Sequence, residues 1–184
     1  MLLLIGDFHI PDRASHVPRP IKERVESREY KLILCTGDLT GEDILEWLQS
    51  LKGSVKVVEG NMDYLSLPTH EVVEYRGLAV GLIHGHQVYP RGDTTKLGAI
   101  ADSLGVQVLV TGHTHFPQIE TVKTASIHAI LNPGSATGCW GGDPRATGIP
   151  SFMEAEVEGK LIHISLLEVR EGSLVERRFK LKLD

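Results

Sequence analysis

Metal-ligand side chains follow five strand-like segments of this 184-residue chain. In each case a short apolar run ends and an Asp, Asn or His comes directly after it. These side chains are Asp7 and His9 in GDFH, Asp38 in GDLT, Asn61 in GNMD, His84 in HGH, and His113 and His115 in GHTH. Loops of this kind converge at the carboxyl ends of the strands in an open α/β sheet. The pattern therefore predicts one site at one edge of an α/β core.

Short apolar runs alternate with amphipathic patterns over the first two thirds of the chain. Runs rich in β-branched residues predict buried strands at residues 2–5, 31–35, 55–58, 78–83, 106–110 and 127–131. Apolar residues at helical spacing predict helices at residues 21–28, 42–51 and 94–104. Thr40 is expected to cap the second helix, and Gly105 is expected to end the third.

The last third of the chain has the pattern of a β meander. Residues 151–158, 161–169 and 173–183 read as strands separated by tight turns at Gly159 and Gly172. We expect a sheet from the first part of the chain to pack against a more antiparallel sheet from the last part, with helices outside. Because the composition nowhere changes in a way that requires a second domain, residues 1–184 are interpreted as one domain.

The composition limits the classes of partner. No apolar stretch approaches the roughly 18 residues that a bilayer requires, so we expect no membrane span. Residues 1–5 lack the basic start and the cleavage site of a signal peptide, which leads us to expect a cytoplasmic location. A formal net charge of −5 argues against nucleic acid as a partner. It allows a small phosphate-ester substrate, because bound metals would make the site locally positive.

The predicted ligands offer carboxylate, amide and imidazole donors without a thiolate. Such donors suit two divalent metal ions, with manganese as the first candidate and nickel, zinc, iron or magnesium as alternatives. A glycine directly precedes Asp7, Asp38, Asn61 and His113. We expect it to permit a sharp turn after each strand. Each motif is weak by itself, but the five motifs in this order are highly specific.

The ordered motifs GDFH, GDLT, GNMD, HGH and GHTH resemble those of the calcineurin-like metallophosphoesterase superfamily. The stretches GDFHIP, ILCTGDLT, GLIHGHQVYPRGD, NPGSATG and IPSF resemble one small branch of it, which holds archaeal and bacterial phosphodiesterases and the smallest subunit of eukaryotic retromer. The resemblance implies a four-layer αββα sandwich, with two mixed sheets flanked by helices. It also implies metal-dependent hydrolysis of phosphodiesters or related phosphate esters by a metal-bridging hydroxide.

The resemblance further implies a role for each ligand. Asp7, His9 and His115 would hold one metal, Asn61, His84 and His113 would hold the second, and Asp38 would bridge both. Many members of the superfamily have a histidine after the Asn that assists the leaving group, but this chain has Met62 there. A thioether cannot donate a proton. His86 is the best substitute, as a phosphate contact or as a group that orients a ligand.

A protein-interaction scaffold like the small retromer subunit, with weak or no catalysis, is the alternative function. In the eukaryotic subunit the bridging Asp and the metal-binding Asn are altered, whereas this chain keeps Asp38 and Asn61. A nuclease or cyclic-nucleotide phosphodiesterase would use the same metals. The motifs leave open a homo-oligomer or a protein partner.

Several residues near the motifs have both a structural and a functional interpretation. Asp63 is expected to bond backbone amides in a turn. Residues 132–135 are either a turn or part of the rim of the site. Trp140 lies in a glycine-rich loop, where an aromatic side chain would flank either the substrate or a partner.

Overall fold

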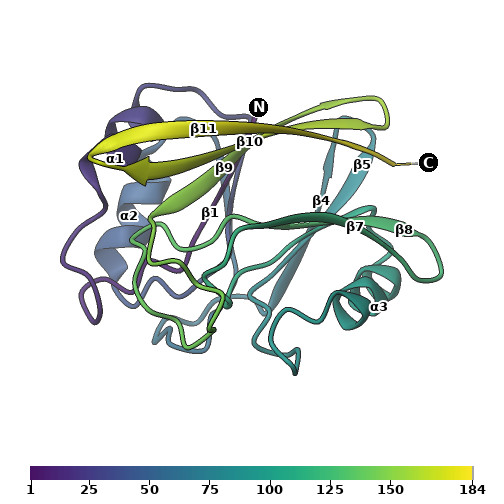
Figure 1. The fold of residues 1–184 in the computed structure, drawn as a ribbon, viewed down its shortest axis with the longest axis horizontal. Coiled ribbons are helices and arrows are strands. Elements are labelled where there is room, and N and C mark those ends of the chain that lie inside the picture. Colours follow the sequence, from purple (N-terminus) through teal and green to yellow (C-terminus); the bar gives the residue numbers. More distant parts are fainter. Residues whose placement is uncertain (184) are drawn as a thin grey trace.

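The computed structural model describes residues 1–183 as two stacked β-sheets flanked by helices (Figure 1). The elements are β1 (Leu2–Ile5), α1 (Arg19–Glu26), β2 (Leu32–Cys35), α2 (Glu42–Ser50), β3 (Ser54–Val57), β4 (His70–Tyr75), β5 (Leu78–Ile83), α3 (Thr94–Leu104), β6 (Val108–Val110), β7 (Gln118–Lys123), β8 (Ile127–Asn132), β9 (Ser151–Glu158), β10 (Leu161–Arg170) and β11 (Ser173–Lys182). One sheet has the strand order β11-β10-β9-β1-β2-β3, and the other has β4-β5-β6-β8-β7.

Both sheets are mixed. In the first, β1 and β2 pair in parallel with Leu2 opposite Leu32, and β9 pairs antiparallel along the other side of β1. In the second, β5, β6 and β8 are parallel, while β4 and β7 pair antiparallel at the two edges. The parallel strands end at the same side of each sheet, so the loops that follow them are gathered on one face of the molecule.

Side-chain alternation along the strands separates four layers. In β1, Leu2 and Leu4 belong to the apolar cluster between the two sheets, which includes Leu82 and Val110 of the second sheet. Leu3 and Ile5 point the other way, into the cluster formed with the helices. This alternation follows from the two-residue period of a strand.

The helices cover the outer faces. Ile21 and Val25 of α1, with Ile44 and Leu48 of α2, pack on the first sheet. Leu97 and Ala101 of α3 pack on the second sheet, and Figure 1 shows α3 at the opposite end of the molecule from α1 and α2. The four-layer αββα architecture implied by the resemblance is therefore confirmed.

Three local expectations were wrong. The meander β9–β11 does not form the second sheet, because β9 adds to the free edge of β1 and extends the first sheet. The second sheet also contains two edge strands, β4 and β7, that were not predicted from the sequence. Thr40 does not cap α2: the cap position is Gly41, and no side chain bonds there. The end of α3 at Gly105 is confirmed, with a φ of 67°.

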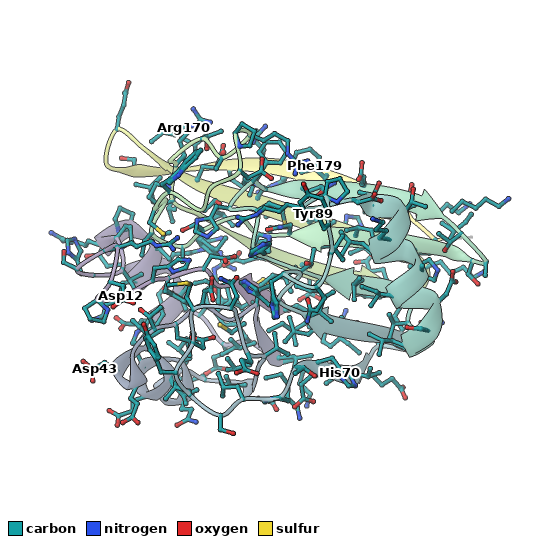
Figure 2. All side chains as sticks on the ribbon, turned by 90° about the horizontal axis from the view of Figure 1, so that it is seen from below. Asp12, Asp43, His70, Tyr89, Arg170 and Phe179 are labelled. Atoms are coloured by element: carbon teal, nitrogen blue, oxygen red, sulfur yellow. The ribbon has the colours of Figure 1, made fainter. Side chains whose placement is uncertain are left out.

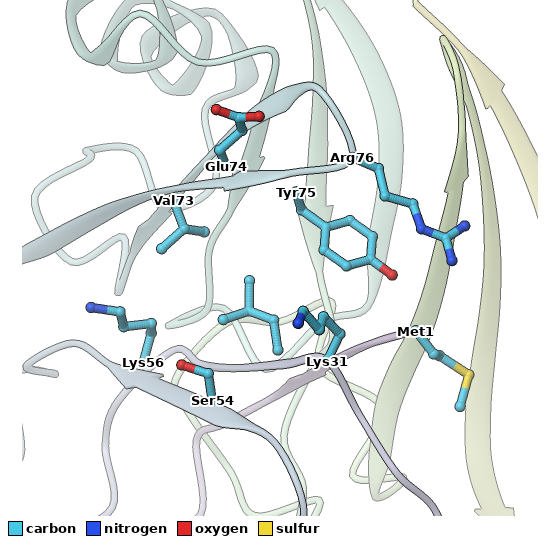
Figure 3. Close-up of a pocket in the computed structure, with 9 residues that line it drawn as sticks. Met1, Lys31, Ser54, Lys56, Val73, Glu74, Tyr75 and Arg76 are labelled. Carbon is cyan, nitrogen blue, oxygen red and sulfur yellow. The ribbon is translucent and has the colours of Figure 1, made fainter.

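A cavity lies at the amino-terminal ends of β1–β3, beneath β4 (Figure 3). Its volume is about 550 Å³, and Lys31, Ser54, Tyr75 and Arg76 are among its lining residues. The predicted ligands follow the carboxyl ends of the strands, so they lie on the opposite side of the sheets. Figure 2 views the molecule from below Figure 1 and shows Asp12 and Tyr89 in loops on either side of the middle of that face.

Candidate metal centre

The loops after β1, β2, β3, β5 and β6 bring the predicted ligands together. Asp7 and His9 follow β1, Asp38 follows β2, Asn61 follows β3, His84 follows β5, and His113 and His115 follow β6. All are buried except Asn61, which is exposed. The group is therefore enclosed by both sheets and opens to solvent near Asn61.

One half of the group surrounds the Nε2 atoms of His9 and His115. These two atoms lie 3.1 Å apart. His9 Nε2 is also 3.2 Å from Asp38 Oδ2, and His115 Nε2 is 3.4 Å from Asp7 Oδ1. One ligand atom from each of the four residues falls within a span of 4.8 Å.

The other half surrounds His84. Its Nε2 lies 3.4 Å from Asp38 Oδ2 and 3.1 Å from Asn61 Oδ1. The ring of His113 lies beside that of His84, with 5.1 Å between the ring centroids. Asp38 Oδ2 faces both His9 and His84, so this single oxygen lies where the two halves meet.

The ring orientations indicate that Nε2 is the donor atom toward a metal. Nδ1 of His84 donates to the carbonyl oxygen of Thr36 at 2.7 Å, and Nδ1 of His115 donates to that of Cys139 at 2.7 Å. In a neutral ring the Nε2 atom then carries a lone pair. These lone pairs point at other acceptor atoms, an arrangement that repels unless a cation or an added proton lies between them.

The spacing between these atoms also suits a metal. Ligand atoms bind divalent metals at about 2.0–2.2 Å, which places neighbouring ligands of one ion about 3–3.5 Å apart. The contacts that link His9, His115, Asp7, Asp38, His84 and Asn61 span 3.1 to 3.4 Å. Both halves of the group therefore fit the metals that the donor set predicts.

The backbone of the ligand loops is strained. The φ angles of Asp7, His9, Asp38, His113 and His115 lie between 49° and 68°, in the left-handed region that non-glycine residues rarely occupy. Each costs about 1–2 kcal/mol relative to the right-handed conformation. Strain of this kind gathers at functional sites, where the surrounding structure holds it in place.

The preceding glycines act mainly through their small size. Of the four, Gly37 alone has a positive φ, of 92°. Gly60 and Gly112 do not, but a Cβ on Gly60 would lie 2.1 Å from Asp38 Oδ1, and one on Gly112 would lie 2.5 Å from Asp7 Oδ2. At these two positions a side chain would occupy the space of a ligand carboxylate.

The two halves differ little in charge without metal. Burial lowers the pKa of His115, but the hydrogen bond and charge of Asp7 outweigh it and raise that pKa to about 10. Burial also lowers the pKa of His84, but its contact with Asp38 outweighs this effect and raises that pKa. Burial would raise the pKa of Asp38, yet its contacts with His84 bring it to about 2. In each half, one imidazole thus has a raised pKa and favours a proton at the position where a metal would bind.

The remaining two imidazoles favour the neutral form. Burial lowers the pKa of His9, and a smaller contribution comes from the charge of Arg13. Burial and the neighbouring His84 lower the pKa of His113 to about 4, with a further contribution from Arg91. Neutral imidazole is the form that binds a metal.

His86 lies beside the second half of the group. Its ring is exposed, 5.4 Å from that of His84 and 6.3 Å from that of His113. Met62 contributes its backbone N–H, which donates to Asp38 Oδ1 at 2.8 Å. The structure therefore places an imidazole at the open side of the group and a thioether residue where many relatives have a histidine.

Some supporting residues have the structural role that the sequence suggested. Asp63 accepts four backbone N–H groups, from Asp38, Leu39, Thr40 and Gly60. Asn132 donates to Gly112 O and Thr114 Oγ1, and Ser135 donates to Asp7 O. These groups hold the ligand loops, and Asn132 and Ser135 are buried beneath them rather than at the rim.

Two backbone carbonyl groups and two arginines near the site were not predicted from the sequence. The carbonyl oxygens of Thr36 and Cys139 orient His84 and His115, and Arg13 and Arg91 lie beside the loop that contains Cys139. A carbonyl oxygen belongs to every residue, so the sequence has no signal for it. Arg91 does have a sequence signal, because it directly follows the stretch HGHQVYP.

The comparisons with known proteins agree with the geometry. The sequence model of the calcineurin-like phosphoesterase superfamily domain matches residues 1–158. A probable metallophosphoesterase of Methanothermobacter thermautotrophicus is 41% identical over 177 residues, which is 95% of this chain and 94% of the relative.

Two solved structures also resemble the chain closely. The zinc complex of wild-type Vps29 from Entamoeba histolytica is 35% identical, with a TM-score of 0.87 over 97% of this chain and 98% of that one. Vps29 from Chaetomium thermophilum, in complex with a cyclic peptide, is 28% identical, with a TM-score of 0.78 over 99% and 95% of the two chains. In residues 1–183, no helix is long and apolar enough to span a membrane.

Proposed function

We propose, because the chain belongs to the calcineurin-like phosphoesterase superfamily, that it is a metal-dependent hydrolase of phosphodiesters or related phosphate esters. The observation that carries this proposal is the position of Asp38 Oδ2, which lies 3.2 Å from His9 Nε2 and 3.4 Å from His84 Nε2. An oxygen so placed is suited to join two metal sites. Two divalent metals there would supply an activated water and would offset charge on the phosphoryl oxygens.

Each half of the group would hold one metal. Asp7, His9 and His115 would bind the first, Asn61, His84 and His113 would bind the second, and Asp38 would bind both. Manganese is the first candidate, and nickel, zinc, iron or magnesium fit the same donors. The zinc-bound Vps29 of Entamoeba histolytica supports a divalent metal in this fold.

The other residues of the site would orient the ligands and the substrate. The carbonyl oxygens of Thr36 and Cys139 fix the rings of His84 and His115, so that Nε2 of each ring faces the centre. Met62 lacks a proton to give to a departing alkoxide. His86, exposed beside His84, is the group that we assign to the phosphate or the leaving group.

The test is hydrolysis of an aryl phosphodiester with added manganese or nickel, together with metal analysis. The protein is expected to hold about two metals. Asp38→Asn and His84→Ala are each expected to lower kcat by about 10²-fold or more. His163→Ala removes a half-buried histidine from β10 and serves as the matched control, because its register opposite Glu156 places it near the amino-terminal end of β1, away from the ligand loops. Unchanged rates in both ligand variants would contradict the proposal.

A protein-interaction scaffold with weak or no catalysis is the second candidate. It is favoured by the likeness to Vps29 structures, one of which holds a cyclic peptide. Protein that is purified without added metal, contains none and cleaves no phosphate ester after metal is supplied would support this candidate instead. A cytoplasmic location, a single domain, a homo-oligomer and a protein partner stay predictions.

A further inference from the structure

Residues 139–141, in the loop between β8 and β9, contact the metal-centre residue His115. Three successive carbonyl oxygens of this loop accept hydrogen bonds from three other loops: Cys139 O from His115 Nδ1, Trp140 O from Arg13 Nη1, and Gly141 O from Arg91 Nη1. A Cβ added to Gly141 would lie 2.4 Å from the ring of His115. The backbone of Trp140 is therefore fixed at the edge of the centre.

The two arginines that hold this loop differ from the other arginines of the chain. Arg19, Arg24, Arg28, Arg76, Arg145, Arg170, Arg177 and Arg178 each pair with a carboxylate. Within residues 1–183, neither Arg13 nor Arg91 lies within 4.0 Å of a carboxylate oxygen, although the chain as a whole has a net charge of −5. Among the arginines of residues 1–183, the two without a carboxylate partner are thus the two that hold this loop.

The two guanidinium groups come from loops of different sheets and reach adjacent carbonyl groups. Arg13 lies in the loop after β1, which contains His9, and Arg91 lies in the loop after β5, which contains His84 and His86. With residues 139–142 they line a cavity of about 610 Å³. A guanidinium has five N–H donors, so the carbonyl bonds leave donors of both arginines available to an anion in this cavity.

The ring of Trp140 is open to the same cavity. Its side chain is 62% exposed. Trp47, the other tryptophan, packs edge-on against Phe8 with 6.1 Å between ring centroids, and its Nε1 donates to Glu26. The backbone of Trp140 is fixed, and nothing in residues 1–183 packs over its indole as Phe8 packs on Trp47. Such an indole is a surface on which a flat ring can stack.

We propose, on the basis of the phosphoesterase function proposed above, that Trp140, Arg13 and Arg91 select phosphate esters that carry an aromatic ring. The ring of the ester stacks on Trp140. The arginines bind oxygens of the phosphoryl group or of a neighbouring anionic group, because planar guanidinium matches phosphate geometry. The substrate class is a small aryl or nucleotide-like phosphodiester, in preference to an alkyl one.

The test uses a matched pair of uncleavable ligands, phenylphosphonate and methylphosphonate, which share the phosphonate group and differ in the ring. In the zinc-loaded full chain, phenylphosphonate is expected to bind about tenfold more tightly by calorimetry. Trp47→Phe leaves Trp140 as the single indole, and its fluorescence is expected to change saturably with phenylphosphonate. Trp140→Leu should abolish the preference, and Trp140→Phe should keep most of it.

The arginine variants separate anion binding from stacking. Arg13→Gln and Arg91→Gln should each weaken both phosphonates severalfold, whereas Arg19→Gln, on the outer face of α1, should weaken neither. Equal binding of the two phosphonates, or a preference that survives Trp140→Leu, would overturn the inference.

The same measurements distinguish this inference from the proposed function. If p-nitrophenyl methyl phosphate is cleaved and methylphosphonate binds, but the phenyl group gives no advantage, only the role of Trp140 is wrong. If no phosphodiester is cleaved and neither phosphonate binds, both proposals are overturned.

Discussion

Asp63 Oδ2 accepts the backbone N–H of Asp38 at 2.8 Å, so one carboxylate holds the loop that presents another. The same side chain accepts the N–H groups of Leu39, Thr40 and Gly60 at 2.7 to 3.0 Å. Each carboxylate oxygen thus takes two donors. These bonds maintain the left-handed conformation of Asp38 and Thr40, whose φ angles are 53° and 63°.

We therefore predict that Asp63→Asn destabilises the protein by about 2–4 kcal/mol. The amide places an NH₂ group against two backbone N–H donors, and an unsatisfied donor costs about 1–3 kcal/mol. Metal content should fall as well, since Asp38 loses its support. Denaturant unfolding and metal analysis measure the two effects. The control is Asp12→Asn, an exposed acid in the loop after β1, and equal stability of the two variants would contradict the prediction.

The second prediction concerns protons and metal binding. In the metal-free protein the pKa of His115 is raised to about 10 by Asp7, despite burial, and that of His84 is also raised. Metal must displace these protons, so at pH 7 binding should release at least one proton and affinity should rise with pH. Calorimetry in buffers of different ionisation enthalpy counts the protons. Affinity that does not depend on pH between 6 and 8 would contradict this prediction.

The raised pKa of His115 also determines how the stability of the metal-free protein changes with pH. The folded-state pKa of His115 lies above its ordinary value of 6.5. Its contribution is therefore fully present below about pH 6.5 and is lost as the pH rises toward 10. Denaturant unfolding of His115→Gln and of the unsubstituted protein, both without metal, should differ most below pH 6.5. With metals bound, this dependence on His115 should disappear because the ring no longer titrates.

Another prediction concerns which of His86 and Met62 affects assistance to the leaving group. His86→Gln should slow phenyl esters by about 10²-fold and p-nitrophenyl esters much less, because a good leaving group needs little proton donation. Met62→His places an imidazole where many relatives have one, and it should speed the poor leaving groups preferentially. Rates for a series of aryl phosphodiesters provide the measurement, and an equal loss across the series would exclude proton donation by His86.

The parts of the fold that were predicted correctly are those whose local pattern is decisive. β1 and β2 are buried on both faces and read as uninterrupted apolar runs. The missed strands, β4 and β7, are the edges of the second sheet, and charged residues such as Glu71 and Glu120 interrupt their apolar pattern. Edge strands carry such charges to prevent pairing with other chains. The pairing of β9 with β1 joins residues about 150 positions apart, which no local pattern encodes.

The donor side chains of the candidate site could be predicted from the sequence, but the groups that hold them in place could not. Asp7, Asp38 and His113 can be recognised in the sequence because they are polar residues directly after apolar strands. The left-handed backbone of these three residues was not predicted, because non-glycine residues rarely adopt it. The arginine–carbonyl contacts of residues 139–141 depend on three loops meeting in space. The motifs therefore predict which side chains the structure brings together, whereas the tertiary structure decides how they are held.

The last prediction uses the close approach of Gly112 to Asp7. A Cβ at Gly112 would lie 2.5 Å from Asp7 Oδ2 and 2.6 Å from Thr36 Oγ1, so Gly112→Ala must displace the carboxylate. Because the φ of Gly112 is not in the left-handed region, backbone strain is not the cause. We expect the first metal to bind about 10–100-fold more weakly, as when a supporting contact of a ligand is lost.

Gly105→Ala is the matched control for this prediction. Its φ of 67° strains an alanine, yet nothing lies within 4 Å of the added Cβ. It should lower the free energy of unfolding by about 1 kcal/mol and leave metal affinity unchanged. Metal titration of both variants, with unfolding measured in parallel, separates loss of the ligand position from loss of stability. If Gly112→Ala bound metal as tightly as Gly105→Ala does, the carboxylate of Asp7 would not be a ligand of the first metal.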